Sequence, residues 1–267
     1  MLYILVLLFA ELLAGSVLAL DSDREISQYN SKTWGVDEQL PQVSVTALAQ
    51  DSKGYVWVGT QSGIARFNGK EFVSFNRSNT AAFKSNIVKD ILVDSQNTLW
   101  VLTENGIAFA EQEGFQAVSL EPNDLVKPNR LLEYEQSIIV ASTNGLHKVV
   151  NGKIEPYLLS KESFALKSVN QTLYVGGRGQ FTTILNGKTQ VNKLPAGYQS
   201  AIINAFALQS EDIWLATSEG PLVVRKDKIE VPQDLLGLNG ENISDLIRVF
   251  DTKHEQTCKL FLITAGT

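Results

Sequence analysis

One short segment recurs along this chain about every forty residues, and this repetition constrains the fold more than any other feature. Each copy centres on a large apolar residue, and successive copies are separated by 35 to 47 residues. A glycine follows six residues after the large residue in four of the six copies. The six residues are Trp57, Trp100, Ile139, Tyr174, Trp214 and Phe261.

Each copy also contains the pattern of several short strands joined by turns. The first has an alternating stretch over 44–49, a polar turn over 51–54, the aromatic strand, and a third strand over 64–67. Asn-Gly pairs occur at 68–69, 151–152 and 186–187, and they predict two-residue hairpins because both residues tolerate a positive φ. Asp51 and Asp94 are expected to cap equivalent turns.

Four short strands in such a period predict one blade of a β-propeller. The large aromatic residue of each second strand is well placed to fill the space between neighbouring blades. We therefore expect an all-β propeller of about five four-stranded blades and part of a sixth. It is expected to be incomplete, since the sequence ends at Thr267 within that sixth copy.

The N-terminus is apolar over Leu2–Ala10 and again over most of 12–20. This pattern predicts a signal peptide over 1–19, forming a helix and cleaved after Ala19, followed by the propeller over 20–267. No Lys or Arg precedes Arg24, which is unusual for a signal peptide, and an uncleaved anchor or a buried helix are the alternatives. The predicted location is periplasmic or extracellular.

Charge and composition exclude several classes of function. The chain has 29 acidic and 23 basic residues and a net charge of −6, which argues against a nucleic-acid partner. Cys258 is the one cysteine, and His147 and His254 are the two histidines. A disulfide framework and a cysteine-rich metal site are therefore excluded, and we expect neither a cofactor nor a metal.

Residues 33–75 resemble the repeat of the two-component regulator propeller family, and 85–118 and 201–228 resemble it less closely. The resemblance lies in Thr33-Trp34-Gly35, Leu40-Pro41-Gln42, Trp57-Val58-Gly59-Thr60 and Gly63-Ile64-Ala65-Arg66-Phe67. It implies the periplasmic sensor region of a hybrid histidine kinase or diguanylate cyclase, which is homodimeric at full length in some members. Such a propeller is followed by an immunoglobulin-like domain, a membrane span and a cytoplasmic output domain. None of these is in this sequence, so we expect a ligand-binding input domain that is not an enzyme.

In other propellers, the loops between second and third strands share one face with the loops that enter first strands. That face is expected to hold the ligand-binding residues. Their polar and mostly uncharged character suits a small saccharide-like ligand, and the arginines suit a carboxylate. Such residues also commonly bond their own backbone in tight turns. The candidates are Thr60, Gln61, Thr103, Asn105, Arg130, Asn144, Arg178 and Glu219.

Two other functions stay open at this point. Some propellers are lyases or glycosidases, and His147 or a scattered Asp or Glu could then supply an acid or base. Alternatively the propeller could be a passive scaffold for protein interactions. The segment Gly176-Gly177-Arg178-Gly179 has the composition of a phosphate-binding loop, but no helix follows it, so we interpret it as a turn within a blade.

Overall fold

The computed structural model describes residues 32–111, 114–121, 125–158, 162–226, 228–250 and 258–264. The predicted signal helix and His254 lie outside these residues. The chain divides into two compact units, and the larger consists of Trp34–Arg248 and Leu260–Thr267. The described part of the smaller unit is limited to residues 32–33 and short ends of two strands.

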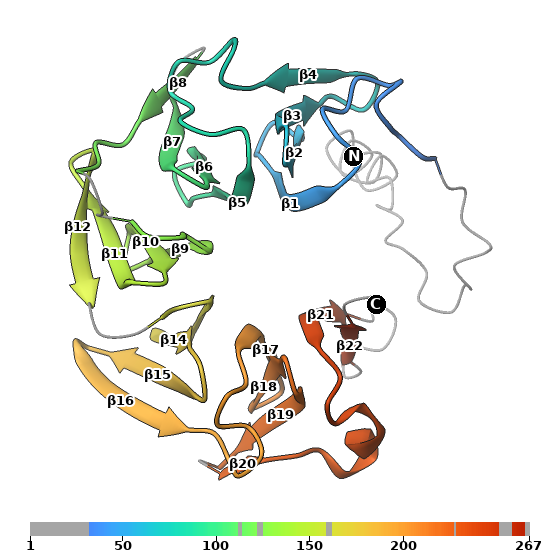
Figure 1. Cartoon of the computed structure of the whole chain (residues 1–267), viewed down its shortest axis with the longest axis vertical. Coiled ribbons are helices and arrows are strands. Elements are labelled where there is room, and N and C mark those ends of the chain that lie inside the picture. The colour runs from blue at the N-terminus through green and yellow to red at the C-terminus, as the bar shows by residue number, and fades with distance from the viewer. Residues whose placement is uncertain are drawn as a thin grey trace, which may run out of the picture. The chain divides into compact units, whose positions relative to one another are not determined.

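The described strands form five four-stranded sheets and one two-stranded sheet, and each four-stranded sheet is an antiparallel meander of consecutive strands (Figure 1). We call these sheets blades 1 to 6. Blade 1 comprises β1 (Val45–Gln50), β2 (Val56–Thr60), β3 (Gly63–Phe67) and β4 (Phe72–Phe75). Blade 2 comprises β5 (Val88–Val93), β6 (Leu99–Thr103), β7 (Gly106–Glu111) and β8 (Gly114–Ala117). Blade 3 comprises β9 (Arg130–Tyr134), β10 (Ser137–Ser142), β11 (Gly145–Val150) and β12 (Lys153–Leu158).

The later blades follow the same order. Blade 4 comprises β13 (Ala165–Val169), β14 (Thr172–Gly176), β15 (Gln180–Leu185) and β16 (Lys188–Lys193). Blade 5 comprises β17 (Ile203–Gln209), β18 (Asp212–Thr217), β19 (Gly220–Arg225) and β20 (Lys228–Glu230). A short 3₁₀ helix, Gln233–Leu238, precedes blade 6, which consists of β21 (Ile243–Phe250) and β22 (Cys258–Thr264). The arrangement confirms the predicted all-β propeller fold.

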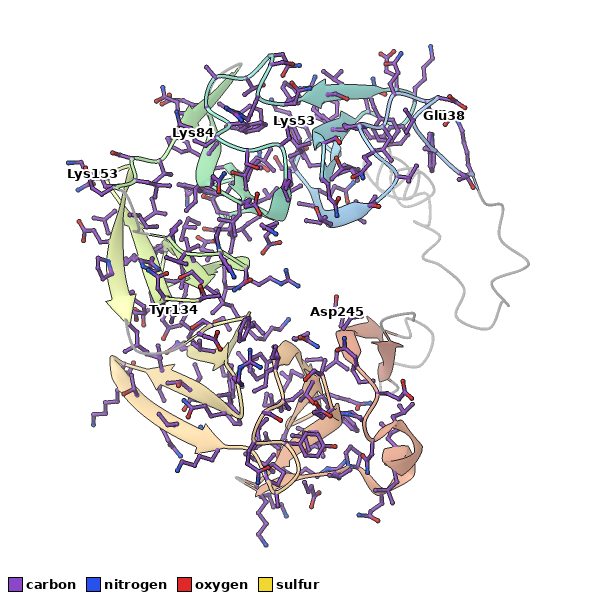
Figure 2. All side chains as sticks on the ribbon, in the orientation of Figure 1. Glu38, Lys53, Lys84, Tyr134, Lys153 and Asp245 are labelled. Carbon is purple, nitrogen blue, oxygen red and sulfur yellow. The ribbon has the colours of Figure 1, made fainter. Side chains whose placement is uncertain are left out.

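In blades 1 to 5, the first strand of one blade contacts the first strand of the next. These contacts join β1 to β5, β5 to β9, β9 to β13, and β13 to β17. The first strands therefore form the inner edges of these blades (Figure 1). Side chains fill the spaces between successive blades (Figure 2).

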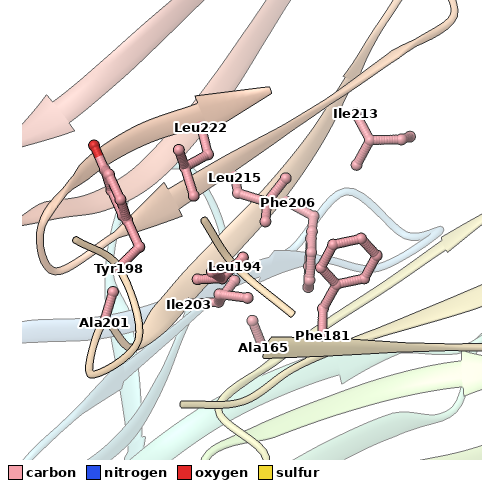
Figure 3. Close-up of a cluster of buried hydrophobic side chains, with 10 residues drawn as sticks. All are labelled: Ala165, Phe181, Leu194, Tyr198, Ala201, Ile203, Phe206, Ile213, Leu215 and Leu222. Atoms are coloured by element: carbon pink, nitrogen blue, oxygen red, sulfur yellow. The ribbon is translucent and has the colours of Figure 1, made fainter. Parts of the chain in front are cut away.

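Apolar clusters between blades hold the structure together. Between blades 4 and 5, Phe181 and Phe206 pack edge to face with ring centres 6.1 Å apart (Figure 3). A Cβ on Gly176 would lie 2.8 Å from Cγ2 of Ile203, so this close approach of the two blades requires glycine. The second-strand aromatics Trp57, Trp100, Tyr174 and Trp214 all pack in such clusters, as the repeat predicts.

Two aspartates cap the turns between first and second strands and also bind the aromatic residue six positions later. Oδ1 of Asp51 accepts hydrogen bonds from the backbone N–H groups of Lys53 and Tyr55, and Oδ2 accepts one from Nε1 of Trp57 at 2.9 Å. Asp94 binds Trp100 in the same way at 2.8 Å. This confirms the predicted capping role.

The Asn-Gly hairpins are of two kinds. Asn151 and Asn186 have φ values of 49° and 50°, and the glycine after each has a φ of 72°, which confirms two-residue turns. The prediction for residues 68–69 is wrong, because β3 and β4 are joined by the four residues 68–71. There the Oδ1 atom of Asn68 accepts the N–H groups of Lys70 and Glu71, both at 2.9 Å, and this bonding stabilises the longer loop.

Candidate functional site

Loops between second and third strands bond the segments that lead into first strands. The N–H of Glu104 donates to the carbonyl of Ile87 at 2.9 Å, and the N–H of Thr143 donates to that of Val126 at 2.9 Å. The N–H of Ser218 donates to the carbonyl of Ile202 in the same way in blade 5. These contacts confirm that the two sets of loops lie together. We call the surface that they form the loop face.

Two candidate residues on the loop face are buried, and their side chains form hydrogen bonds within their own turns. Thr60 is 0% exposed and Thr103 is 1% exposed. The hydroxyl of Thr60 donates to the carbonyl of Gly63 at 2.8 Å, and that of Thr103 donates to the carbonyl of Gly106 at 3.0 Å. The hydroxyls of Ser142 and Thr217 likewise donate to the carbonyl of the glycine three residues later. A hydroxyl three residues before glycine is therefore a structural feature of this repeat.

Other candidates occupy the loop face with different partners. The backbone N–H of Gln61 donates to Oε1 of Gln42, and its own side chain is exposed. Oδ1 of Asn144 accepts the N–H of Val126 at 3.1 Å. Arg130 is exposed and donates from Nη1 to the carbonyl of Asn129. The backbone carbonyl of Glu219 accepts the N–H of Gly240 at 2.9 Å.

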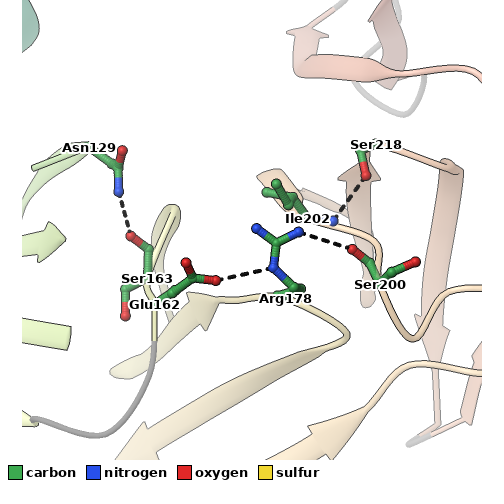
Figure 4. A network of polar contacts seen from close by, with 7 residues as sticks. All are labelled: Asn129, Glu162, Ser163, Arg178, Ser200, Ile202 and Ser218. Carbon is green, nitrogen blue, oxygen red and sulfur yellow. Dashed lines mark hydrogen bonds and ion pairs between the residues drawn. The ribbon is translucent and has the colours of Figure 1, made fainter. Parts of the chain in front are cut away.

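Arg178 lies in a polar network that crosses from blade 3 to blade 5 (Figure 4). Its Nε donates to Oε2 of Glu162 at 3.1 Å, and its Nη1 donates to the carbonyl of Ser200 at 3.4 Å. On one side of this pair, Nδ2 of Asn129 donates to the carbonyl of Ser163. Both charged side chains are more than 40% exposed, so the ion pair contributes about 0–1 kcal/mol to stability. Its arginine can therefore exchange partners at little cost.

A cavity of about 840 Å³ opens on the loop face between blades 2 and 3. We call it the loop-face cavity. Asn105 is the one candidate residue in its lining, and Asn144 supports the rim through its bond to Val126. The volume lies within the range of about 300–1,000 Å³ typical of small-ligand sites. The lining consists of Lys84, Glu104, Asn105, Ala117, Val118, Ser119, Leu120, Glu121, Leu125, Val126 and Lys127.

The lining combines balanced charge with apolar surface. Lys84 and Lys127 carry positive charge, Glu104 and Glu121 carry negative charge, and Leu120 and Leu125 provide apolar area. Several lining residues belong to the connectors before and after blade 2, where the repeat pattern gives no signal. Sequence reasoning missed them for this reason. The cavity can bind a polar or amphipathic ligand by hydrogen bonds and apolar contact.

Asp90 and His147 are two ionisable groups outside this cavity, the first half-buried and the second buried. Desolvation raises the pKa of Asp90, although its carboxylate accepts the N–H of Leu131 at 2.8 Å and that of Ile91 at 2.9 Å. His147 on β11 is 2% exposed, and its Nδ1 lies 3.4 Å from Oγ of Ser142. Across the part of the chain that the structure describes, no group of three or more His, Cys, Asp or Glu side chains is arranged to hold a metal.

Two of the repeats match a known protein family. Residues 39–62 and 82–105 match the family "two component regulator propeller". These segments span β1 with β2 in blade 1 and β5 with β6 in blade 2. No curated protein matches the chain in sequence. No helix among the described residues has the length and apolar character that a membrane span requires.

Three solved structures of propellers are similar to this chain. The extracellular domain of the hybrid two-component system BT3049 from B. thetaiotaomicron has a TM-score of 0.64 at 17% identity, over 74% of this chain and 31% of that chain. Virginiamycin B lyase from Staphylococcus aureus, crystallised with quinupristin, has a TM-score of 0.64 at 15% identity, over 78% and 76%. PorZ, a surface component of the type-IX secretion system of Porphyromonas gingivalis, has a TM-score of 0.60 at 16% identity. The similarity covers 82% of this chain and 33% of that chain. At these identities the similarity shows the fold.

Proposed function

We propose that this chain, two of whose repeats match the two-component regulator propeller family, is the ligand-binding input domain of a signal-transduction protein. The observation that carries the proposal is the family match over blades 1 and 2, next to the loop-face cavity. The similarity to an extracellular domain of a hybrid two-component system supports the same role and a location outside the cytoplasm. This chain spans 31% of that extracellular domain.

The proposed site is the loop-face cavity, and the proposed ligand is a small, neutral, polar molecule of the saccharide type. The amide of Asn105 can donate and accept hydrogen bonds, and Lys84 and Glu104 can bind hydroxyl groups. Leu120 and Leu125 can contact the apolar face of a sugar ring. Because the four charged side chains in the lining balance one another, a ligand without net charge fits best. In this proposal the chain binds its ligand without catalysis.

A titration of the purified chain with a panel of oligosaccharides tests the proposal. We expect one class of sugar to raise the melting temperature and to give a saturable signal in calorimetry. The variants Asn105→Ala and Lys84→Ala should each weaken binding by roughly 2- to 12-fold, as expected for one hydrogen bond. Lys70→Ala is the matched control, since Lys70 is exposed on the β3–β4 loop outside this cavity.

Three results would count against the proposal. The first is the absence of any stabilising sugar, and the second is binding that neither cavity variant weakens. The third is turnover of a bound sugar, detected as new products by mass spectrometry, which would make the chain an enzyme instead.

A further inference from the structure

Two arginines lie over second-strand tryptophans, in blades 1 and 5, but only one of them is neutralised by carboxylates of the described residues. The guanidinium carbon of Arg225 lies 5.8 Å from the ring centre of Trp214. Its Nε lies 2.8 Å from Oδ2 of Asp212, and its Nη1 lies 3.1 Å from Oε1 of Glu230. Hydrogen bonds to these two carboxylates raise the pKa of Arg225.

Arg66 in blade 1 also lies over aromatic rings, but it forms no ion pair with a carboxylate of the described residues. Its guanidinium carbon lies 4.7 Å from the ring centre of Tyr55 and 5.8 Å from that of Trp57. No acidic side chain among the described residues forms an ion pair with it. When a guanidinium stacks on an aromatic face, its five N–H donors lie in its own plane and are not directed at the ring. Those donors are therefore available to an external acceptor.

Arg66 lines a cavity of about 280 Å³ between blades 1 and 2. We call it the Arg66 cavity. Phe75 of blade 1 and Phe115 of blade 2 form part of its wall, with ring centres 5.4 Å apart. The volume is near the lower end of small-ligand sites, so a molecule with a single ring is the appropriate size.

Charge in the Arg66 cavity favours an anion. Lys53, in the turn between β1 and β2, adds a second positive charge. Asp51 also lines the cavity, but its carboxylate already accepts two backbone N–H groups and the indole N–H of Trp57. The two cations therefore face an acidic group whose oxygens are engaged, and their own donors remain open to a ligand.

We propose that the Arg66 cavity is a second binding site, which takes a small planar carboxylate such as benzoate. Arg66 holds the carboxylate through two in-plane N–H donors, which is the geometry that favours arginine over lysine. The ring of the ligand packs against Phe75 and Phe115, so that it contacts blades 1 and 2 together. This site is separate from the loop-face cavity, and the inference does not depend on the proposed function.

Calorimetric titration of the full chain with benzoate tests this inference. We expect saturable binding by the unmodified chain and no comparable binding of benzamide, which has the same ring without the charge. Arg66→Gln should weaken benzoate binding by about tenfold or more, because a hydrogen bond to a charged group is lost. Arg225→Gln is the matched control, and we expect it to change the affinity less than about twofold, the scatter allowed for distant, independent sites.

Several outcomes would overturn the inference. These are the absence of saturable benzoate binding, equal binding of benzamide, and unchanged affinity in Arg66→Gln. Circular dichroism would show whether that variant folds. If it does not, Arg66→Lys provides the second test, since it keeps the charge and loses the paired donors. We expect it to bind more weakly than the unmodified chain, and full affinity would refute the two-donor geometry.

Discussion

The bond between the Asp94 carboxylate and the Trp100 indole allows a sharp test of how this repeat is stabilised. The distance from Nε1 to Oδ2 is 2.8 Å, and the bond is partly buried. A hydrogen bond to a charged group contributes about 1.5–3 kcal/mol, and partial exposure favours the lower end of that range. Oδ1 of Asp94 also accepts the N–H groups of Gln96 and Thr98, at 3.0 Å and 2.7 Å.

Replacement of Asp94 by Ala removes all three bonds and should lower the free energy of unfolding by about 3 kcal/mol. For a domain of this size that loss corresponds to a decrease in Tm of roughly 6–12 °C. Asp94→Asn retains an oxygen for the turn and loses only the charged acceptor of the indole. A double-mutant cycle of Asp94→Asn with Trp100→Phe should therefore give a coupling energy of about 1.5 kcal/mol in urea unfolding.

Blade 5 supplies the internal control for this experiment. The indole Nε1 of Trp214 is buried and has no hydrogen-bond partner among the described residues. Trp214 is buried and Trp100 is half-buried, and Trp214→Phe removes apolar contact without removing a hydrogen bond. Trp100→Phe should lose about 1.5 kcal/mol from its hydrogen bond in addition to apolar contact. A coupling energy near zero in the cycle would refute the reasoning.

Two further predictions concern contacts between blades. Asp90→Asn keeps an oxygen for the N–H of Leu131 but removes a half-buried charge. Desolvation raises the pKa of Asp90 in the folded state above its ordinary value of 3.8. The folded state therefore binds this proton more tightly than the unfolded state does. The stability that this provides is full below pH 3.8 and is lost as the pH rises through the folded pKa. Relative to the unmodified chain, Asp90→Asn should therefore gain stability in urea unfolding from pH 3 towards pH 7, and a constant difference would contradict this. Gly59→Ala places a Cβ 2.7 Å from Cγ1 of Val88 and should destabilise the fold by about 1–3 kcal/mol, whereas Gly114→Ala has open space within 4 Å and should leave Tm nearly unchanged.

The sequence predicts the fold well because each structural unit is local and repeated. The aromatic of each second strand, the capping aspartates, and the Asn-Gly turns at 151–152 and 186–187 all depend on interactions within a few residues. The prediction for the Asn68 turn is wrong because the same dipeptide can open a longer loop when the Asn side chain accepts N–H groups two and three residues later. Dipeptide composition alone does not separate these two geometries.

The candidate site was less predictable, and the physical reason is visible at the loop face. Thr60 and Thr103 are polar turn residues in the sequence, but their hydroxyls close the turn onto a glycine carbonyl. Asn105 is also a polar residue in a turn between second and third strands, but it lines the loop-face cavity. Lys84 and Leu125 line it as well, from connectors that differ between every pair of blades. Ligand contact at any of these positions stays a prediction.

Every described four-stranded sheet is made from one uninterrupted stretch of chain, and this has a consequence for how the molecule can be divided. A cut between two blades severs no strand from its sheet, so each half retains whole sheets. The halves would meet again through faces such as the one formed by Phe181 and Phe206. The junctions between blades are therefore natural break points for split reporters and for rejoining the chain in a new order.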